Sequence, residues 1–514
     1  MTQEWKPFKT THLTRGAGAW MPQLAWLSML VLGLSMTSSP VVHHDLWHEM
    51  ALAREVVRTS AMPLQDPFAY TSTVRPMIDH EWGAGLVGLF VVRMGGGLAL
   101  GLFNACILGS ALLLLALRLR ADSVPLPLAL ATAAVSIASG VLGTPPVAAQ
   151  AYSVLACSLL LLLLRRDEAG GRWWIALWLA VCALWVNLHG GLVVGFAILG
   201  SYAIEQAARG RPWTHLAATM AGMAAVVSLT PYGLGYYRYI LETLTMPRPI
   251  IVEWNPRWLV TEIGFPQLLF LASLCAAIVV AWRTGWRNFE GILMVAVLAA
   301  ATTRAVKILP FYSLAWTVTV ARAISKTKFA QSAERLGARE AGTLSVAFVS
   351  AAAVCLVWGS YNRQFWCARI PGSPSAGAVR LFSPAGPVDF LKKHSFRGNV
   401  MTGFIDGAYV AWKLHPNVKV GCDGRYDIAY QPEFVESVVH MYRTGDLKTL
   451  EDITRRYPTD LVLARVKEPL ARKIEEQGKW RMVYEDDGFM LFARPGLSLP
   501  YEQRKGEKIV GTIP

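Results

Sequence analysis

Long apolar segments recur along most of this chain, and they constrain its fold more than any other feature of the sequence. Each segment is close to, or a little shorter than, the roughly twenty residues that an α-helix needs to cross a bilayer. The segments that we predict to span are residues 21–42, 97–117, 124–142, 146–164, 173–188, 192–208, 214–230, 263–282, 290–306, 309–324 and 341–359. The pattern predicts a polytopic α-helical membrane protein with about eleven transmembrane helices.

The composition excludes an ordinary soluble protein, because 54% of the 514 residues are hydrophobic and only 16% are charged. A net charge of +14 would suggest nucleic acid in a soluble chain. Here the basic residues gather in alternate connections between the apolar segments, so one orientation places all of them in the cytoplasm. We therefore expect no nucleic-acid partner, a cytoplasmic N-terminus and, with an odd number of spans, an extracytoplasmic C-terminal region.

The chain divides into a predicted transmembrane domain, residues 1–362, and a small extracytoplasmic α/β domain, residues 363–514, that ends in a flexible polar tail. In the second part, "GNVMTGF", "VKVGCDG" and "TDLVLAR" have the composition of strands, and "MVYEDDGFMLFAR" predicts a hairpin that turns at Asp-Gly. "PEFVESVVHMYRTG" and "LKTLEDITRRY" predict helices. Cys367 and Cys422 can form a disulfide if this region is extracytoplasmic, although their spacing alone does not show it.

The first exterior connection, residues 43–96, begins with "HHDLWHEM", where polar groups are unusually dense. Asp45, His48 and Glu49 stand at i, i+3 and i+4, so one helix face would present all three. After two prolines, "DHEW" returns Asp79, His80 and Glu81 to the membrane surface, and we expect "GAGLVGLFVVRM" after it to lie in the interface or to re-enter. The alternative is that these residues are ordinary interfacial polar groups beside anchoring tryptophans.

Polar residues inside or beside other apolar segments are further candidates. "WVNLHGG" places Asn187 and His189 at an exterior helix end, and "TTRAVKILP" places Arg304 and Lys307 beside another exterior connection. Charged groups at such depth are costly, so they tend to face a cavity or a partner. Two cations there can hold a phosphate, or they can extend to the lipid headgroups instead.

The second exterior connection contributes Tyr232, Glu253 and Trp254, an aromatic and polar mixture that suits a sugar or a lipid headgroup, and equally suits a loop that touches the membrane. In the C-terminal region, "CDGRYDIAY" brings Asp423 and Arg425 together after a predicted strand. We interpret that segment as a turn fixed by its own ion pairs.

A series of longer motifs resembles one known group of proteins. The motifs are "HDLWHEMALAREVVRTSAMPLQDPFAYTSTVRPMIDHEW", "WVNLHGG", "TPYG", "VEWNP", "RAVKILPFY" and "GAYVAWKLHPNVKVGCDGRYD", and they extend over nearly the whole chain. Together they resemble bacterial membrane proteins related to the GT-C glycosyltransferases. The sequence departs from the pattern at "LW", where relatives have a doubled Trp, and at Thr230, where an Asn is common.

The resemblance implies a GT-C-like enzyme of the bacterial inner (plasma) membrane that transfers a hexose or pentose outside the cytoplasm. Its donor would be a polyprenyl-phosphate-linked sugar, and its acceptor a lipid, a glycan or a protein. In GT-C enzymes the acidic residue of the first exterior loop acts as general base or helps to bind a divalent metal. By position that residue here is Asp45.

The chemistry of such a transfer assigns roles to the other candidates. The reaction needs a base for the acceptor hydroxyl and positive charge for the leaving phosphate. Asp45 is the predicted base, with Asp79 and Glu81 as rivals or helpers, and Arg304 and Lys307 are predicted to hold the phosphate. The predicted ligands of a divalent metal, Mn²⁺, Mg²⁺ or Zn²⁺, are His44, His48, Glu49 and His80.

Two other classes of function stay open at this point. A transporter or flippase of a lipid-linked or polar substrate would use the same buried cations and histidines as gates, although the sequence shows no inverted repeat that would support it. A non-catalytic membrane scaffold would use its outer domain to bind a glycan or a protein.

Overall fold

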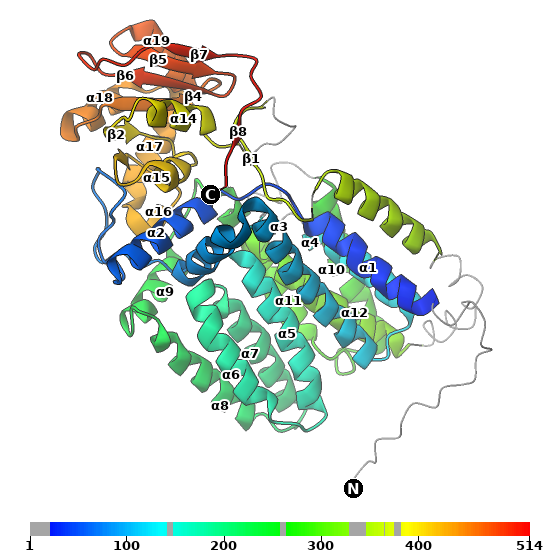
Figure 1. The fold of residues 1–514 in the computed structure, drawn as a ribbon. Helices are drawn as coiled ribbons and strands as arrows, with labels where there is room; N and C mark the ends of the chain where they lie inside the picture. The colour runs from blue at the N-terminus through cyan, green and yellow to red at the C-terminus, as the bar shows by residue number, and fades with distance from the viewer. Residues whose placement is uncertain are drawn as a thin grey trace.

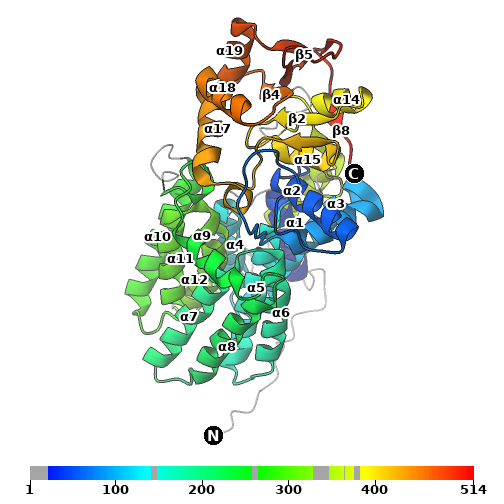
Figure 2. The same ribbon diagram turned by 90° about the vertical axis from the view of Figure 1, so that its left-hand side faces the viewer.

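We describe the protein from a computed structural model, which covers residues 21–513 except 141–146, 257–263, 328–345, 364 and 375–381. The larger part is a bundle of α-helices, and a smaller unit that contains a β-sheet sits on one end of it (Figure 1). The second view shows the same two layers, with the loop after α2 reaching up along the smaller unit (Figure 2).

The helices of the larger part follow the apolar segments of the sequence. They are α1 (Met21–Thr37), α2 (Asp45–Thr59), α3 (Trp82–Ala121), α4 (Leu126–Gly140), α5 (Gln150–Glu168), α6 (Trp174–Leu188), α7 (Leu192–Ala208), α8 (Thr214–Val226), α9 (Gly235–Thr245), α10 (Phe265–Thr284), α11 (Ile292–Arg304) and α12 (Leu309–Ser325), with short 3₁₀ turns η2 (Val227–Leu229), η3 (Val252–Trp254) and η5 (Val306–Ile308). A further helix covers Val346–Tyr361.

Three of the described helical segments are long and apolar enough to cross a membrane: Trp82–Ala121, Phe265–Thr284 and Val306–Ser325. Seven further described helices are apolar but shorter. The helical fold expected from the sequence is therefore confirmed, whereas the number of about eleven spans and their orientation stay predictions.

Helix α3 contains residues 83–94, for which we expect an interfacial or re-entrant position. The backbone leaves helical geometry at Gly95 and Gly96, so these residues form a helical segment that a kink separates from the rest of α3, and their position relative to a membrane stays a prediction. Gly96 has a φ of +56°, and a Cβ on Gly97 would lie 2.4 Å from the carbonyl oxygen of Ala368. The helix changes direction there because the chain that leads into the C-terminal unit passes against its backbone.

Helix α12 lies in the middle of the helical part. Nearly every side chain from Leu309 to Ala323 is buried, and the helix packs against α4, α10 and α11. Its entry turn η5 carries Lys307, so the packing of α12 fixes where that lysine lies.

The C-terminal unit contains a six-stranded sheet with the strand order β3-β2-β4-β6-β5-β7. Its elements are β1 (Ile370–Pro371), α14 (Ala385–Lys393), β2 (Gly398–Met401), α15 (Gly407–Leu414), β3 (Val418–Val420), α16 (Tyr426–Ala429), α17 (Pro432–Thr444), α18 (Leu447–Arg456), β4 (Leu461–Arg465), α19 (Pro469–Gln477), β5 (Arg481–Asp486), β6 (Phe489–Ala493), β7 (Glu502–Arg504) and β8 (Val510–Gly511). Strand β2 runs parallel to β3 and β4, whereas β5 and β6 form the predicted antiparallel hairpin. The strands and helices expected from the sequence in this region are confirmed.

One expectation for the C-terminal region was wrong, and the disulfide that the sequence left open is not formed. The polar tail is not free: β7 pairs with β5, and β8 pairs with β1, because the edge of β5 is open and Ile509 has a buried place to occupy, with 3% of its surface exposed. Cys367 and Cys422 are both free thiols. Cys422 lies in the core of the C-terminal unit, whereas Cys367 lies against α3, where a Cβ on Gly101 would be 2.6 Å from its nitrogen.

Candidate functional site

Asp45 begins helix α2, and the two histidines before it fold back onto its carboxylate. Nδ1 of His43 lies 3.2 Å from Oδ2 of Asp45, and Nε2 of His44 lies 3.2 Å from Oδ1. An acidic residue in the first turn is stabilised by the partial positive charge of the helix N-terminus. We call His43, His44 and Asp45 the first-loop cluster. Its side chains each offer a ligand atom, and these atoms lie within 4.8 Å of one another.

The charges of the first-loop cluster are set by its own members. Burial would raise the pKa of Asp45, but the neighbouring imidazoles, above all the charge and hydrogen bond of His43, outweigh burial and hold the pKa well below its usual value. Burial, together with the charge of His43, lowers the pKa of His44 to about 3, so this imidazole is neutral near pH 7. The Asp45 side chain keeps 34% of its surface exposed, which leaves an ionised carboxylate within reach of a ligand.

Two imidazoles and one carboxylate are a donor set that fits Zn²⁺ or Mn²⁺ better than Mg²⁺, which prefers oxygen ligands. Three protein ligands also leave coordination positions for water or substrate. The neutral state of His44 and the ionised state of Asp45 are the states that bind a metal, whereas Asp45 raises the pKa of His43 against the effect of burial, so His43 must lose a proton to become a ligand. The cluster is therefore a candidate metal centre.

The structure changes the predicted ligand set. His44 belongs to the first-loop cluster, but His48 lies one turn further along α2, is 3% exposed, and acts electrostatically on Asp423 as well as on Asp45. Glu49 and His80 contact Glu81 instead. The sequence analysis missed His43. Its only signal was its place next to His44, because helical spacing says nothing about residues that precede the helix.

Glu49 and Glu81 form a buried carboxyl pair with unequal charge. Glu49 is completely buried, and its two oxygens accept no hydrogen bond from the residues that the structure describes. Burial and the neighbouring Glu81 raise the pKa of Glu49 well above its usual value, whereas the charges of His80 and His189 lower the pKa of Glu81 despite burial. The neutral form of Glu49 is therefore favoured beside the negatively charged form of Glu81.

A chain of hydrogen bonds from α5 and α6 orients His189 toward the carboxyl pair. Trp185 Nε1 donates to Ser153 Oγ over 2.7 Å, and Ser153 Oγ lies 2.6 Å from Nδ1 of His189, which also accepts from the Gly191 N–H. Because Nδ1 is an acceptor, Nε2 carries the proton and points at Glu81 Oε1, 3.3 Å away. The glycine is required here, since a Cβ on Gly191 would lie 2.2 Å from Ser153 Oγ.

The turn that contains Asp79 and His80 is held by tyrosines of the second exterior connection. The Asp79 N–H donates to the Tyr232 hydroxyl over 3.0 Å, and Asp79 Oδ1 accepts from the Glu81 N–H over 2.8 Å. His80 Nδ1 lies 2.9 Å from the Tyr239 hydroxyl. Asp79 is fully buried, so it shapes the turn around Glu81 and does not face solvent.

Asn187 has a similar supporting position. Its Oδ1 accepts a hydrogen bond from Trp82 Nε1 over 3.1 Å, and its amide nitrogen donates to the carbonyl of Ala183 in its own helix. A Cβ on Gly83 would lie 2.3 Å from the Asn187 carbonyl oxygen, so α3 and α6 are in close contact here. Asn187 therefore fixes the start of α3.

Lys307 is the cation that faces the site. Its Nζ lies 3.2 Å from Glu253 and 5.3 Å from the ring centre of Trp254, and its charge acts on His43, Glu81 and His189. Arg304, predicted as its partner, lies exposed at the end of α11, and among the described residues it makes no ion pair. The structure thus brings Lys307, Glu253 and Trp254 beside the first-loop cluster and leaves Arg304 outside.

The C-terminal unit closes over the first-loop cluster. A Cβ on Gly424 would lie 3.5 Å from Asp45 Oδ1. On either side of that glycine, Asp423 and Arg425 form the ion pair expected from the sequence, with Arg425 Nη2 2.7 Å from Asp423 Oδ2. Arg425 also binds Asp66 of the first loop over 2.5 Å, which the sequence analysis missed. The contact joins two motifs that lie 359 residues apart in sequence.

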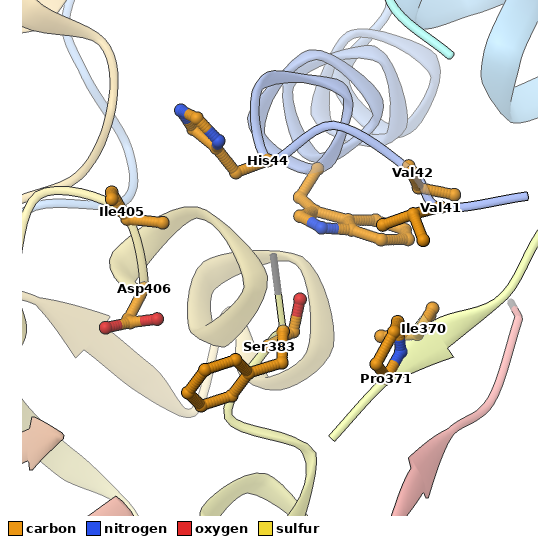
Figure 3. Close-up of a pocket in the computed structure, with 10 residues that line it drawn as sticks. Val41, Val42, His44, Ile370, Pro371, Ser383, Ile405 and Asp406 are labelled. Carbon is orange, nitrogen blue, oxygen red and sulfur yellow. The ribbon is translucent and has the colours of Figure 1, made fainter. Parts of the chain in front are cut away.

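A small pocket opens next to the first-loop cluster, between the segment that enters α2 and the C-terminal unit. Val41 and Val42 face Ile370 and Pro371 across it, and His44 and Asp406 line its other end (Figure 3). Its volume of about 10 Å³ suits one water molecule. The pocket is too small for a sugar.

No protein-family model and no curated protein matches the sequence. The structure is similar to that of the oligosaccharyltransferase from Archaeoglobus fulgidus in its apo form, with a TM-score of 0.55 and 12% identity over 94% of this chain and 75% of that chain. The form tethered to an acceptor peptide with the NVT sequon gives a TM-score of 0.54 at 10% identity, over 88% and 70% of the two chains. The complex with an inhibitory peptide and a dolichol-phosphate gives 0.54 at 11% identity, over the same shares.

This chain has the fold of an archaeal oligosaccharyltransferase. The GT-C-like fold that the sequence resemblance implied is thereby confirmed. The bacterial subgroup that it also implied gains no support from these archaeal structures and stays an expectation.

Proposed function

We propose that this protein is a membrane glycosyltransferase that moves a sugar, a hexose or a pentose, from a polyprenyl-phosphate-linked donor to a lipid, glycan or protein acceptor. Residues 1–362 form the transmembrane domain and residues 363–514 an extracytoplasmic domain, so the reaction takes place on the outer face of the inner membrane. The fold supports this proposal, since the similar oligosaccharyltransferase structures contain an acceptor peptide and a dolichol-phosphate.

The observation that carries the proposal is the partly exposed Asp45 carboxylate, whose low pKa favours its ionised form, together with Lys307, on which its charge acts. The acceptor's nucleophilic group attacks the anomeric carbon of the sugar and forms the new glycosidic bond. The bond from that carbon to the donor phosphate breaks, and the phosphate leaves with the electron pair. Asp45 accepts the proton that the acceptor loses, and the positive charge of Lys307 stabilises the leaving phosphate.

The neighbouring groups keep these two residues in place. Glu81, held by His189 and by Glu49, contributes a fixed negative charge that attracts Lys307. Glu253 binds the same lysine from the second exterior connection. A divalent metal held by the first-loop cluster would act as a Lewis acid on phosphate oxygens.

The test compares Asp45→Asn with Asp389→Asn, which makes the same chemical change at an exposed position on α14. In proteoliposomes supplied with a lipid-linked sugar donor and an acceptor, we expect Asp45→Asn to lower transfer by about 100-fold or more. We expect Asp389→Asn to retain full activity and both variants to unfold at the wild-type temperature in detergent. Full transfer by Asp45→Asn would remove this residue from the mechanism.

A further inference from the structure

A polar pocket of about 560 Å³ lies where residues 65–75 of the first loop run along the sheet of the C-terminal unit. Its volume is in the range of small-molecule binding sites. Hydroxyl, amide and cationic groups line it, among them Tyr70, Ser72, Thr73, Arg75, Asn399 and Lys419, together with the carboxylate of Asp66. A lining of this kind excludes an apolar ligand, because such a ligand would leave these groups without hydrogen-bond partners.

The walls of the pocket are held by hydrogen bonds to the C-terminal unit. The Tyr70 N–H donates to the Val420 carbonyl over 3.1 Å, and Thr71 Oγ1 donates to the Gly421 carbonyl over 2.7 Å. The loop thus lies alongside β3, with Ala69 bridged in parallel to Val420. Asn399 and Lys419 are paired residues of β2 and β3, so their side chains project from the same face of the sheet. The pocket is therefore formed before any ligand arrives.

Two cationic side chains at the pocket have no negatively charged partner in the described part of the chain. Arg75 and Lys419 are exposed, and neither has an ion-pair partner among the residues that the structure describes. The acidic groups nearby have their own cationic partners: Asp66 shares Arg425 with Asp423, and Asp460 binds Arg494 over 2.9 Å. A ligand that fills the pocket gains most if it carries negative charge.

We propose that this pocket binds an anionic saccharide, a sugar that carries carboxylate or phosphate groups. The hydroxyl and amide groups match the hydroxyls of a sugar, and the two cations match its negative charge. A bare inorganic anion would satisfy the cations but leave most of the volume empty. The proposal concerns binding alone and stands whether or not the protein transfers sugars.

The test measures binding of four probes to the purified full-length protein in detergent: digalacturonic acid, glucose 6-phosphate, the neutral disaccharide cellobiose, and inorganic phosphate. We expect digalacturonic acid or glucose 6-phosphate to bind at least about tenfold more tightly than cellobiose and inorganic phosphate. We also expect the affinity for the anionic sugar to fall as salt is added. The better of the two identifies whether carboxylate or phosphate is the preferred charge.

A matched pair of double variants locates the binding. The double variant Arg75→Gln with Lys419→Gln should lower the affinity for the anionic sugar by about tenfold or more. The double variant Arg456→Gln with Lys448→Gln also removes one arginine and one lysine charge, but from exposed positions on α18, and it should leave the affinity for the anionic sugar unchanged. The proposal is wrong if no probe binds, if cellobiose or inorganic phosphate binds as tightly as the anionic sugars, or if the two double variants behave alike.

Discussion

Glu49 and Glu81 are two carboxyl groups in one buried contact, and the structure gives them different charges. We expect Glu49→Gln to be tolerated within about 1 kcal/mol, because a neutral amide of the same size replaces a carboxyl group whose neutral form burial already favours. Glu81→Gln should cost about 3 kcal/mol and most of the transfer activity, because it removes the anion that His189 and Lys307 face. Thermal unfolding in detergent and the liposome assay measure both effects; equal losses would contradict the assigned charges.

The same pair predicts a dependence of stability on pH. Because the pKa of Glu49 is higher in the folded protein than its usual 4.5, its stabilising contribution is complete below that value and is lost as the pH rises through the folded pKa. Glu49→Gln has no proton to lose, so its unfolding temperature should fall less than that of the wild type over the same rise in pH. A variant with the wild-type slope would show that Glu49 is already ionised.

For single residues, the sequence predicted which ones lie in the same region of the molecule, but not which pairs of them are in contact. The helical spacing of Asp45, His48 and Glu49 was correctly assigned to α2. The group that each residue interacts with depends on what lies opposite the helix: Glu49 interacts with Glu81, and the charge of His48 acts on Asp423. Local spacing carries no information about those contacts.

Helices α2 and α3 are in backbone contact, and that contact places Asp45. A Cβ on Gly85 would lie 2.2 Å from the Glu49 carbonyl oxygen, so Gly85→Ala must push the helices apart. We expect it to cost about 1–3 kcal/mol and to reduce transfer. Gly109→Ala in the same helix meets nothing within 4 Å and should be neutral or slightly stabilising. Thermal unfolding of both variants measures the difference. Equal unfolding temperatures would show that the contact between α2 and α3 at Gly85 is not tight.

The elements that the sequence predicted well are those that burial alone determines. Apolar length fixed most of the helices, and alternation with an Asp-Gly turn fixed the hairpin of β5 and β6. The sequence placed a boundary at the break in α3, between residues 83–94 and the predicted span 97–117, but it did not predict why the helix breaks there or that the tail forms strands, because both depend on distant parts of the chain. Gly97 meets Ala368, and a Cβ on Gly96 would lie 3.1 Å from the Ile513 carbonyl oxygen.

Across the whole molecule, the first loop and the C-terminal unit share one core. Trp47 of α2 packs edge-on against Tyr409 of α15, with ring centres 5.5 Å apart, while Arg425 ties Asp66 to Asp423. The sequence predicted two domains, but it did not predict that the second covers Asp45. The first-loop motif and the "CDGRYDIAY" motif each lack any local pattern that indicates contact with the other. This arrangement makes the C-terminal unit one wall of the proposed reaction site.

The most direct test of the proposed function follows both halves of a lipid-linked donor during incubation with the purified wild-type protein in sealed liposomes. A panel of polyprenyl-phosphate sugars, each with a labelled sugar, is supplied together with candidate acceptors. We predict that the label leaves the polyprenyl phosphate and appears on an acceptor for at least one donor, and that Asp45→Asn abolishes this exchange. If the intact donor instead crosses the bilayer with its sugar still attached, or if no donor changes at all, the protein is not a glycosyltransferase.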